Sequence, residues 1–216
     1  MKTTTATRGF NDLITGSFDR LAQAYDFPLL QRVVYQPPQD EAIAELRAAR
    51  SRRVADIGCG TGVLTTRIDR VLAPEQVFGV DPSAGMLAQA RARSNRITWL
   101  ESCAEELPFE DRALDAVVTT TAFHFFDQPA ALREFARVLE PGGLVVIATV
   151  HFDGPLVRPL QELTRHSLSP AHTPSPAETR MLLDEAGFTV TDQRRISRKL
   201  PNWLVPDVIT VAHRHR

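Results

Sequence analysis

The stretch Val54-Ala-Asp-Ile-Gly-Cys-Gly-Thr-Gly62 decides the fold, because an apolar run ends at an acid and is followed by three alternate glycines. Val54, Ala55 and Ile57 are typical of a short buried strand, and residues 63–68 begin a helical pattern. The glycines predict a tight turn, since a residue without Cβ adopts positive φ and lets backbone approach a ligand closely. In open α/β sheets such a turn lines a ligand crevice at the carboxyl end of the strand.

The spacing of the glycines argues against a dinucleotide or a nucleoside triphosphate. A dinucleotide fingerprint, G-x-G-x-x-G, would need its third glycine at position 63, where this chain has Val63. No Gly-Lys-Ser/Thr follows, which excludes a P-loop. A nicotinamide-dependent oxidoreductase is therefore only a less favoured alternative.

Two carboxylates at strand ends indicate another ligand. Asp56 precedes the turn, where its charge suits an ammonium group better than a pyrophosphate. Residues 76–80 form a second predicted strand ending at Asp81, where a carboxylate can accept hydrogen bonds from both ribose hydroxyls. An amino acid joined to a nucleoside without phosphate satisfies both requirements. S-adenosylmethionine is such a ligand.

Four segments resemble the class I S-adenosylmethionine-dependent methyltransferases. They are DIGCGTG at 56–62, GVDPSAGML at 79–87, AEELPF at 104–109 and RVLEPGG at 137–143. The subgroup they resemble is the ubiquinone/menaquinone-biosynthesis-like, or type 11, small-molecule methyltransferases. Because the segments follow the family order and spacing, over roughly residues 10–150, they carry more weight together than any one alone.

The resemblance implies where the cofactor lies. Tyr25 would face its methionine end; its segment is more typical of an amphipathic helix packed on the core, and the two interpretations are compatible. Met86 would lie against the adenosine, although it is equally typical of a core methionine. The cofactor-binding residues implied in this way are Tyr25, Asp56, Gly58, Cys59, Gly60, Asp81, Pro82, Met86, Cys103, Ala104, Glu105 and Thr120.

One position departs from the family pattern. The family has Gly-Asp-Ala-Glu, in which the aspartate accepts a hydrogen bond from the adenine amino group, whereas this chain has Ser102 and Cys103 before Ala104. A thiol is a poor acceptor. The backbone of Ala104 can still contact the adenine edge, so we expect the cofactor to bind, but more weakly than in relatives that carry the aspartate.

His124 is the general-base candidate in the segment that follows the fourth predicted strand. Its ordinary pKa is close to neutral, and its position resembles that of the catalytic histidine in plant-type O-methyltransferases. A histidine among Phe123, Phe125 and Phe126 is also typical of packing. Both interpretations are open at this point.

The regular alternation of strands and helices predicts an α/β protein with a parallel, doubly wound, Rossmann-like sheet. The resemblance implies seven strands, mostly parallel, with an antiparallel strand near the C-terminal edge. Pro37 and Pro38 are expected to break the chain, Asp127 to cap a helix, and Pro141-Gly-Gly143 to end that helix. The expected helices are 40–49, 82–91, 128–139 and 178–186. The expected later strands are 97–100, 114–118, 144–148, 188–191 and 207–212. Residues 213–216 are expected to form a solvated tail.

We expect a single methyltransferase domain over residues 1–216. Its parts would be a helical cap (1–50), a cofactor-binding core (51–150), an insertion (151–177) and a C-terminal helix with two strands (178–216). In the family such an insertion shapes the substrate pocket, but a plain surface connection is an equal alternative here. Its His151, His166 and His172 lack metal-ligand spacing.

Composition narrows the function classes. The chain has 216 residues, of which 43% are hydrophobic and 24% charged, with a net charge of −1, as in ordinary globular proteins. Scattered basic residues predict no nucleic-acid face, and two cysteines form neither a disulfide framework nor a metal site. No apolar run predicts a membrane span or a signal peptide, so we expect a cytoplasmic location. The oligomeric state is not predicted.

The predicted function is methyl transfer from S-adenosylmethionine to a small-molecule acceptor (EC 2.1.1.-). If His124 acts as a base, the acceptor is a hydroxyl or an acidic carbon, so O- or C-methylation is favoured; the neighbouring phenylalanines favour an apolar or aromatic molecule. The alternative from another class is a protein that binds S-adenosylmethionine or a partner without turnover.

Overall fold

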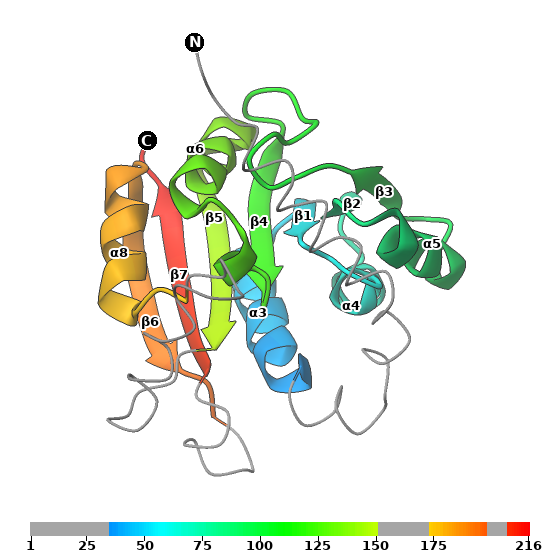
Figure 1. The fold of residues 1–216 in the computed structure, drawn as a ribbon, viewed down its shortest axis with the longest axis horizontal. Coiled ribbons are helices and arrows are strands. Elements are labelled where there is room, and N and C mark those ends of the chain that lie inside the picture. Colours follow the sequence, from blue (N-terminus) through cyan, green and yellow to red (C-terminus); the bar gives the residue numbers. More distant parts are fainter. Residues whose placement is uncertain (1–34, 151–172, 198–206) are drawn as a thin grey trace, which may run out of the picture.

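The computed structural model describes residues 35–150, 173–197 and 207–216, which form a sheet with helices on both faces (Figure 1). Seven strands follow one another across the sheet in the order β3-β2-β1-β4-β5-β7-β6. Only β7 runs antiparallel to its neighbours, β5 and β6. The strands are β1 (Arg53–Ile57), β2 (Gln76–Asp81), β3 (Thr98–Glu101), β4 (Leu114–Thr120), β5 (Leu139–Val150), β6 (Phe188–Arg195) and β7 (Asp207–Arg214). The predicted Rossmann-like sheet with an antiparallel C-terminal strand is confirmed.

The helices pack in two layers. Buried side chains of α3 and α4 join one hydrophobic cluster on one side of the sheet, and those of α6 and α8 join a second cluster on the other side. Strand β4 serves both clusters, because Ala116 and Val118 face the first and Val117 the second. The described helices are α3 (Gln36–Ala48), α4 (Val63–Leu72), α5 (Ala84–Arg93), α6 (Gln128–Val138), α8 (Pro176–Glu185) and the 3-10 turn η2 (Phe123–Phe125).

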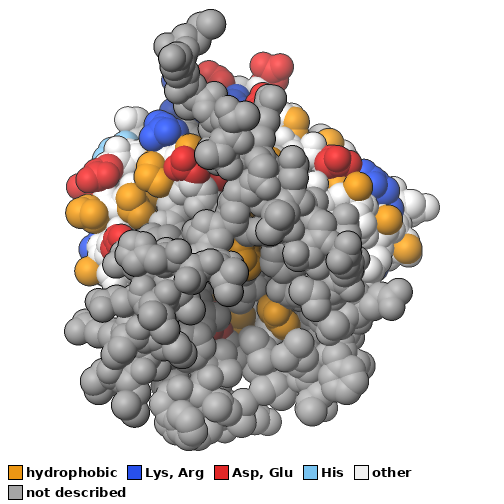
Figure 2. All heavy atoms as spheres, in the orientation of Figure 1, with side chains coloured by type: hydrophobic (Ala, Val, Ile, Leu, Met, Phe, Trp, Pro, Cys, Tyr) orange, Lys and Arg blue, Asp and Glu red, His pale blue; other side chains and the backbone are white. Residues whose placement is uncertain are grey.

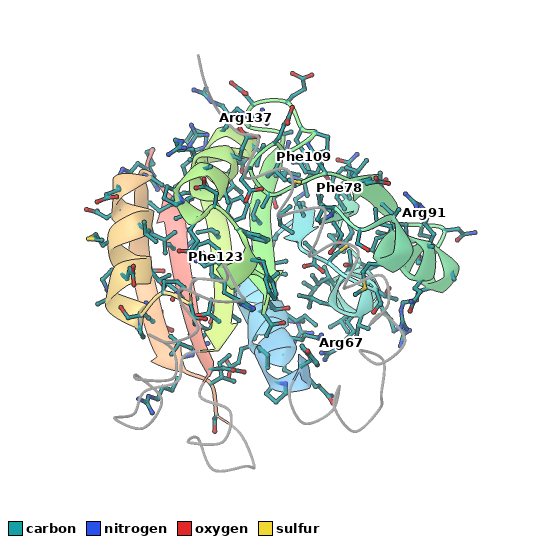
Figure 3. All side chains as sticks on the ribbon, viewed as in Figure 1. Arg67, Phe78, Arg91, Phe109, Phe123 and Arg137 are labelled. Atoms are coloured by element: carbon teal, nitrogen blue, oxygen red, sulfur yellow. The ribbon has the colours of Figure 1, made fainter. Side chains whose placement is uncertain are left out.

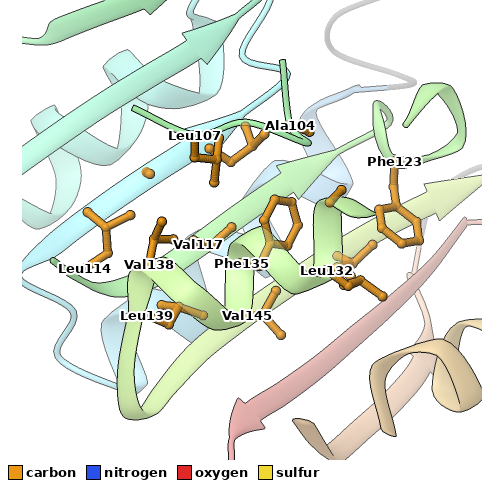
Figure 4. Close-up of a cluster of buried hydrophobic side chains, with 14 of the residues drawn as sticks. Ala104, Leu107, Leu114, Val117, Phe123, Leu132, Phe135, Val138, Leu139 and Val145 are labelled. Carbon is orange, nitrogen blue, oxygen red and sulfur yellow. The ribbon is translucent and has the colours of Figure 1, made fainter. Parts of the chain in front are cut away.

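The second cluster anchors the segment that follows β4. Figure 4 shows Phe123 and Phe135 within it, together with Leu132 and Val145. Phe123 has no exposed surface, and burying an aromatic side chain of this size contributes about 1.5–3 kcal/mol. The apolar contact therefore fixes η2 at the end of β4, next to the carboxyl edge of the sheet.

Two proline segments behave differently from the prediction. Pro37 and Pro38 do not break the chain; they lie in the first turn of α3, where a missing N–H costs no helical hydrogen bond. Pro141-Gly-Gly143 does not end a helix, because α6 already ends at Val138. The segment is an irregularity inside β5, where Gly142 takes a φ of 80° and the pairing with β4 shifts between Leu114 and Ala116.

The expected tail at 213–216 is also corrected. His213 and Arg214 belong to β7 and hold the irregular part of β5: Arg214 donates to the carbonyl of Leu139, and His213 Nδ1 lies 3.2 Å from the carbonyl of Gly142.

Other boundaries differ from the prediction by a few residues. Ser83 rather than Pro82 precedes α5, and α8 begins after Ser175, whose side chain forms a capping box with Glu178. The predicted cap by Asp127 is confirmed.

The buried hydroxyl of Thr119 on β4 generates a stability prediction. Thr119 has no exposed surface, and its Oγ1 has no hydrogen-bond partner among the described residues. We expect Thr119→Val to raise the free energy of unfolding by about 1 kcal/mol, since an unpaired buried hydroxyl carries an uncompensated desolvation cost. This corresponds to roughly 2–4 °C in Tm for a chain of this size, measured by thermal denaturation.

Thr65→Val is the matched control. Thr65 is equally buried, but its hydroxyl donates to Asp56 at 2.6 Å, so the same substitution should lower Tm. A Thr119→Val protein that melts at or below the wild-type temperature would contradict the prediction.

Candidate cofactor and active site

The turn after β1 is tied to the end of β2. Gly58, Gly60 and Gly62 all take positive φ, at 72°, 55° and 77°. The amides of Gly58 and Cys59 both donate to the carbonyl of Val80, at 2.8 and 3.1 Å. The predicted glycine turn is thus confirmed, and its first two N–H groups face the neighbouring strand rather than the crevice.

Asp81 completes this connection. Its Oδ2 accepts from the amide of Gly60 at 2.8 Å, and its Oδ1 accepts from the amide of Ser83 at 2.9 Å. Three successive amides of the turn, at residues 58–60, are therefore engaged within the protein. A pyrophosphate would need such N–H groups for itself, so the geometry does not favour a dinucleotide. A carboxylate oxygen can accept more than one hydrogen bond, so Asp81 can still take a hydroxyl.

Asp56 is a buried acid in the wall of the same crevice. Its side chain is 2% exposed and accepts a hydrogen bond from Thr65 at 2.6 Å. Burial raises the pKa of Asp56 to about 7, and the nearby charge of Asp81 acts in the same direction. A cationic ligand group beside this carboxylate would stabilise its ionised form and offset the desolvation cost of burying its charge.

Gly60 leaves room for a ligand where the other glycines do not. A Cβ built on Gly62 or Gly79 would lie 2.5 or 2.3 Å from the ring of Trp99, and one on Gly58 would lie 2.5 Å from Ala122. A Cβ on Gly60 meets no atom within 4 Å. Packing therefore requires three of these glycines, whereas the surface at Gly60 is open for close approach of a ligand.

The glycine turn, Asp56 and Asp81 line one pocket at the carboxyl ends of β1, β2, β3 and β4. All the cofactor-binding residues expected from the sequence line it except Tyr25, which lies outside the described residues. The pocket lies where the strand order reverses between β1 and β4, the position at which open α/β sheets bind ligands. The residues brought together are Asp56, Gly58, Cys59, Gly60, Asp81, Pro82, Met86, Cys103, Ala104, Glu105 and Thr120.

Sequence reasoning missed part of the pocket wall. Gln39 lies in α3 and Tyr35 immediately precedes that helix, far from the motifs, and no local pattern marks them as ligand-facing. The others adjoin predicted residues and could have been found by extending each strand end by a few positions. They are Thr61, Val63, Leu64, Ser83, Ser102, Thr121, Ala122, Phe125 and Phe126.

The wall after β4 is aromatic and conformationally strained. Thr121 takes a φ of 57°, an outlier for a β-branched residue, and its amide donates to the carbonyl of Ala148 at 2.8 Å. Phe126 lines the pocket and meets the buried Phe123 edge to face, with ring centroids 6.0 Å apart. Strain of this kind persists only where the surrounding structure enforces it, and it gathers at functional sites.

His124 lies beside this wall but is not among the described residues that line the pocket. Its ring centroid lies 4.0 Å from that of Phe125, at a tilt of 45°. Burial lowers the pKa of His124 to about 4, so the imidazole is neutral at pH 7. The residue thus has the protonation state that a base requires, with weakened basicity, and its catalytic role stays a prediction.

Glu105 holds two walls of the pocket together. Its Oε1 accepts from the amide of Asp127 at 2.7 Å, which joins the loop after β3 to the start of α6. Burial raises the pKa of Glu105.

The thiol of Cys59 is also buried. Burial raises the pKa of this thiol well above the usual range, so it stays protonated.

Other features of the described residues do not suggest a different site class. They contain no group of three metal-ligating side chains, and none of their helices is long and apolar enough to cross a membrane. On the face shown in Figure 2, the acidic and basic side chains that are described lie interspersed rather than gathered by sign.

The residues that line the pocket fit S-adenosylmethionine. Every charged described residue in the pocket wall is acidic, namely Asp56, Asp81 and Glu105, which suits a cofactor with a sulfonium and an ammonium group. The open surface at Gly60 and the engaged amides at residues 58–60 agree with a ligand that has no phosphate.

Comparisons with known proteins agree with this geometry. The family model described as a methyltransferase domain matches residues 55–147. An uncharacterized methyltransferase of Mycobacterium bovis is 37% identical over 176 residues, covering 80% of this chain and 67% of that protein. A ubiquinone/menaquinone biosynthesis C-methyltransferase of Campylobacter jejuni is 30% identical over 141 residues, covering 60% of each.

A solved structure with the same fold is also a methyltransferase. The S-adenosylmethionine-dependent methyltransferase of Thermotoga maritima superposes with a TM-score of 0.68 at 25% identity, over 91% of this chain and 98% of that one. The alternative of a nicotinamide-dependent oxidoreductase finds no support in these relatives. The chain belongs to the class I S-adenosylmethionine-dependent methyltransferases of the ubiquinone/menaquinone-biosynthesis type.

Proposed function

We propose that the protein transfers the methyl group of S-adenosylmethionine to an uncharged aromatic or apolar small molecule, at oxygen or carbon. The observation that carries this proposal is that the lining residues outside the expected cofactor set include the uncharged side chains of Ala122, Phe125, Phe126 and Tyr35. No Lys or Arg is among the described lining residues, so an anionic acceptor would have no counter-charge there. The relative named as a quinone-biosynthesis C-methyltransferase supports carbon as an acceptor atom.

The protein's part in such a reaction is positioning. When bound, the cofactor supplies an electrophilic methyl group on a sulfonium, which a nucleophile attacks in line with the breaking bond. The residues of this chain hold both reactants in that alignment and exclude water. Alignment alone can lower a barrier by roughly 7–11 kcal/mol. An acceptor that is already acidic, such as a phenol or an enol, needs little help from a base.

We assign the acids at the strand ends to the two polar parts of the cofactor. Asp56 would pair with the ammonium group, and Asp81 would accept from the ribose hydroxyls while it holds the glycine turn. Met86, buried at the start of α5, would lie against the adenosine. Ala104 would contact the adenine edge through its backbone.

The affinity for the cofactor should depend on pH if Asp56 pairs with its ammonium group. Because the pKa of Asp56 is about 7 without ligand and a cation favours the ionised carboxylate, binding below pH 7 requires loss of a proton. We expect the Kd of S-adenosylhomocysteine, which keeps the ammonium group, to rise by up to about tenfold per pH unit below 7 and to level off above it. Calorimetry from pH 5.5 to 8.5 measures this. Asp56→Asn should bind more weakly and show a flat profile; an unchanged slope in that variant would contradict the assignment.

The affinity for S-adenosylmethionine should depend on the residue at position 103. If its thiol replaces an acceptor for the adenine amino group, Cys103→Asp should tighten S-adenosylmethionine binding by about tenfold, the value of one added hydrogen bond of about 1.4 kcal/mol. Cys103→Ala, which adds no acceptor, is the control. Equal affinities for the wild type and Cys103→Asp in calorimetry would overturn the expectation.

Product formation with different acceptors tests the proposed function itself. Formation of S-adenosylhomocysteine should accelerate with phenolic, enolic or hydroquinone-type acceptors and not with carboxylate or phosphate compounds of similar size. Mass spectrometry of the products would identify the methylated atom. Binding of S-adenosylmethionine with no product formed from any acceptor would favour the alternative of a binding protein without turnover.

His124→Ala belongs in the same assay. Because His124 does not line the described pocket and its basicity is reduced, we expect turnover to fall less than tenfold with cofactor affinity unchanged. A fall of about 10²-fold or more would assign it as the general base.

A further inference from the structure

Gln39 is a buried amide in the pocket wall, and only one end of it is held. The residue lies in the first part of α3 and is 6% exposed. Its Oε1 accepts a hydrogen bond from Arg67 Nη1 at 2.9 Å. No motif predicted a ligand-facing role for Gln39, and neither the fold nor the hydrophobic clusters require an amide there.

Arg67 fixes which way the amide points. A guanidinium group only donates hydrogen bonds, so it pairs with the carbonyl oxygen and not with the NH₂ group. Arg67 is itself held on the other side by an ion pair with Asp40. Figure 3 shows Arg67 between α3 and α4, the two helices that this contact joins. The amide of Gln39 therefore cannot turn over without losing its bond to Arg67.

The NH₂ end of Gln39 is the part without a partner. Among the described residues the structure gives Nε2 no hydrogen bond, although the side chain is almost fully buried and borders the pocket. A held amide with two such N–H groups at a pocket wall suits a ligand that brings an oxygen acceptor.

The acid that lines the same pocket indicates which acceptor Gln39 can serve. Gln39 and Asp56 both line the pocket, and α4 contacts both side chains: Thr65 donates to Asp56, and Arg67 donates to Gln39. Leu64, between the glycine turn and Thr65, lines the same pocket. In an α-amino acid the ammonium and carboxylate groups are attached to the same carbon, so a donor for the carboxylate has to lie beside the acid that takes the ammonium.

We propose that Gln39 donates to the carboxylate of the cofactor's amino-acid end, and that Arg67 is the positioning residue that keeps its NH₂ group turned toward that carboxylate. The proposal rests on the proposed pairing of Asp56 with the ammonium group. It makes α3 part of the cofactor site and explains why a helix remote from the motifs carries a buried, oriented amide.

The experiment compares two ligands that differ at the carboxylate. S-adenosylhomocysteine has the group, and its decarboxylated analogue, the same thioether with hydrogen in place of the carboxylate, lacks it. Gln39→Met keeps the size of the side chain and removes the donor, so it should weaken S-adenosylhomocysteine at least tenfold and change the affinity for the decarboxylated ligand less than threefold. Gln36→Met, the same substitution at an exposed position of α3, is the matched control. Kd values come from calorimetry, or from displacement for the weaker ligand.

Two results would overturn the assignment of Gln39. One is an unchanged affinity of Gln39→Met for S-adenosylhomocysteine, and the other is an equal loss for both ligands, which would place Gln39 at another part of the cofactor. A wild-type protein that binds neither ligand would instead refute the cofactor roles proposed above, so the two failures are distinguishable. A Tm close to wild type for Gln39→Met excludes loss of fold as the cause.

The positioning role of Arg67 has its own readout. Arg67→Met should weaken S-adenosylhomocysteine although Gln39 is intact, and Arg67→Lys, which can still donate to Oε1, should restore at least part of the affinity. Equal affinities for Arg67→Met and the wild type would show that the amide needs no such support.

Discussion

The site depends on the hydrogen bonds that tie the glycine turn to the end of β2. The carbonyl of Val80 takes the amides of Gly58 and Cys59, and the carboxylate of Asp81 takes that of Gly60. These bonds set the distance between two strand ends and leave Gly60 open toward the crevice. They also use up the amides that a phosphate would need, so one local arrangement both builds the crevice and restricts the chemistry of its ligand.

Charge restricts the ligand further. The described wall of the pocket carries three acids and no basic side chain, and one of the acids, Asp56, is buried deeply enough for its pKa to reach about 7. A buried carboxylate without a cation is costly, and a cationic cofactor lowers that cost. On the remaining wall, aromatic rings supply area without charge. The pocket thus combines acids suited to a cation with uncharged aromatic side chains, against which the proposed acceptor would lie.

Residues next to the motifs could be predicted because strand ends carry them into the crevice whatever the rest of the chain does. Asp56, Asp81 and Ala104 are examples, and each lines the pocket as expected. His124 shows the limit of that reasoning. It also follows a strand end, but it is not among the described residues that line the pocket, whereas the neighbouring Phe123 is buried in the core. The packing of the short 3-10 turn decides which of these neighbouring side chains faces the core. The expectation for Pro141-Gly-Gly143 was wrong for a similar reason: α6 ends at Val138, and Leu139 already pairs with Leu114 of β4, so the strand begins before the Pro-Gly-Gly segment is reached.

By itself, the sequence determined the α/β alternation, the glycine turn, the acids at the strand ends and the family. Each of these depends on residues close together in the chain, where periodicity and backbone preference act directly. The tertiary structure alone decided that α3 reaches the pocket, that Arg67 of α4 binds the amide oxygen of Gln39 in the pocket wall, and that the C-terminal strand holds the irregular start of β5. Those features join segments far apart in sequence, and they arise from the packing of helices on the sheet, which no local pattern records.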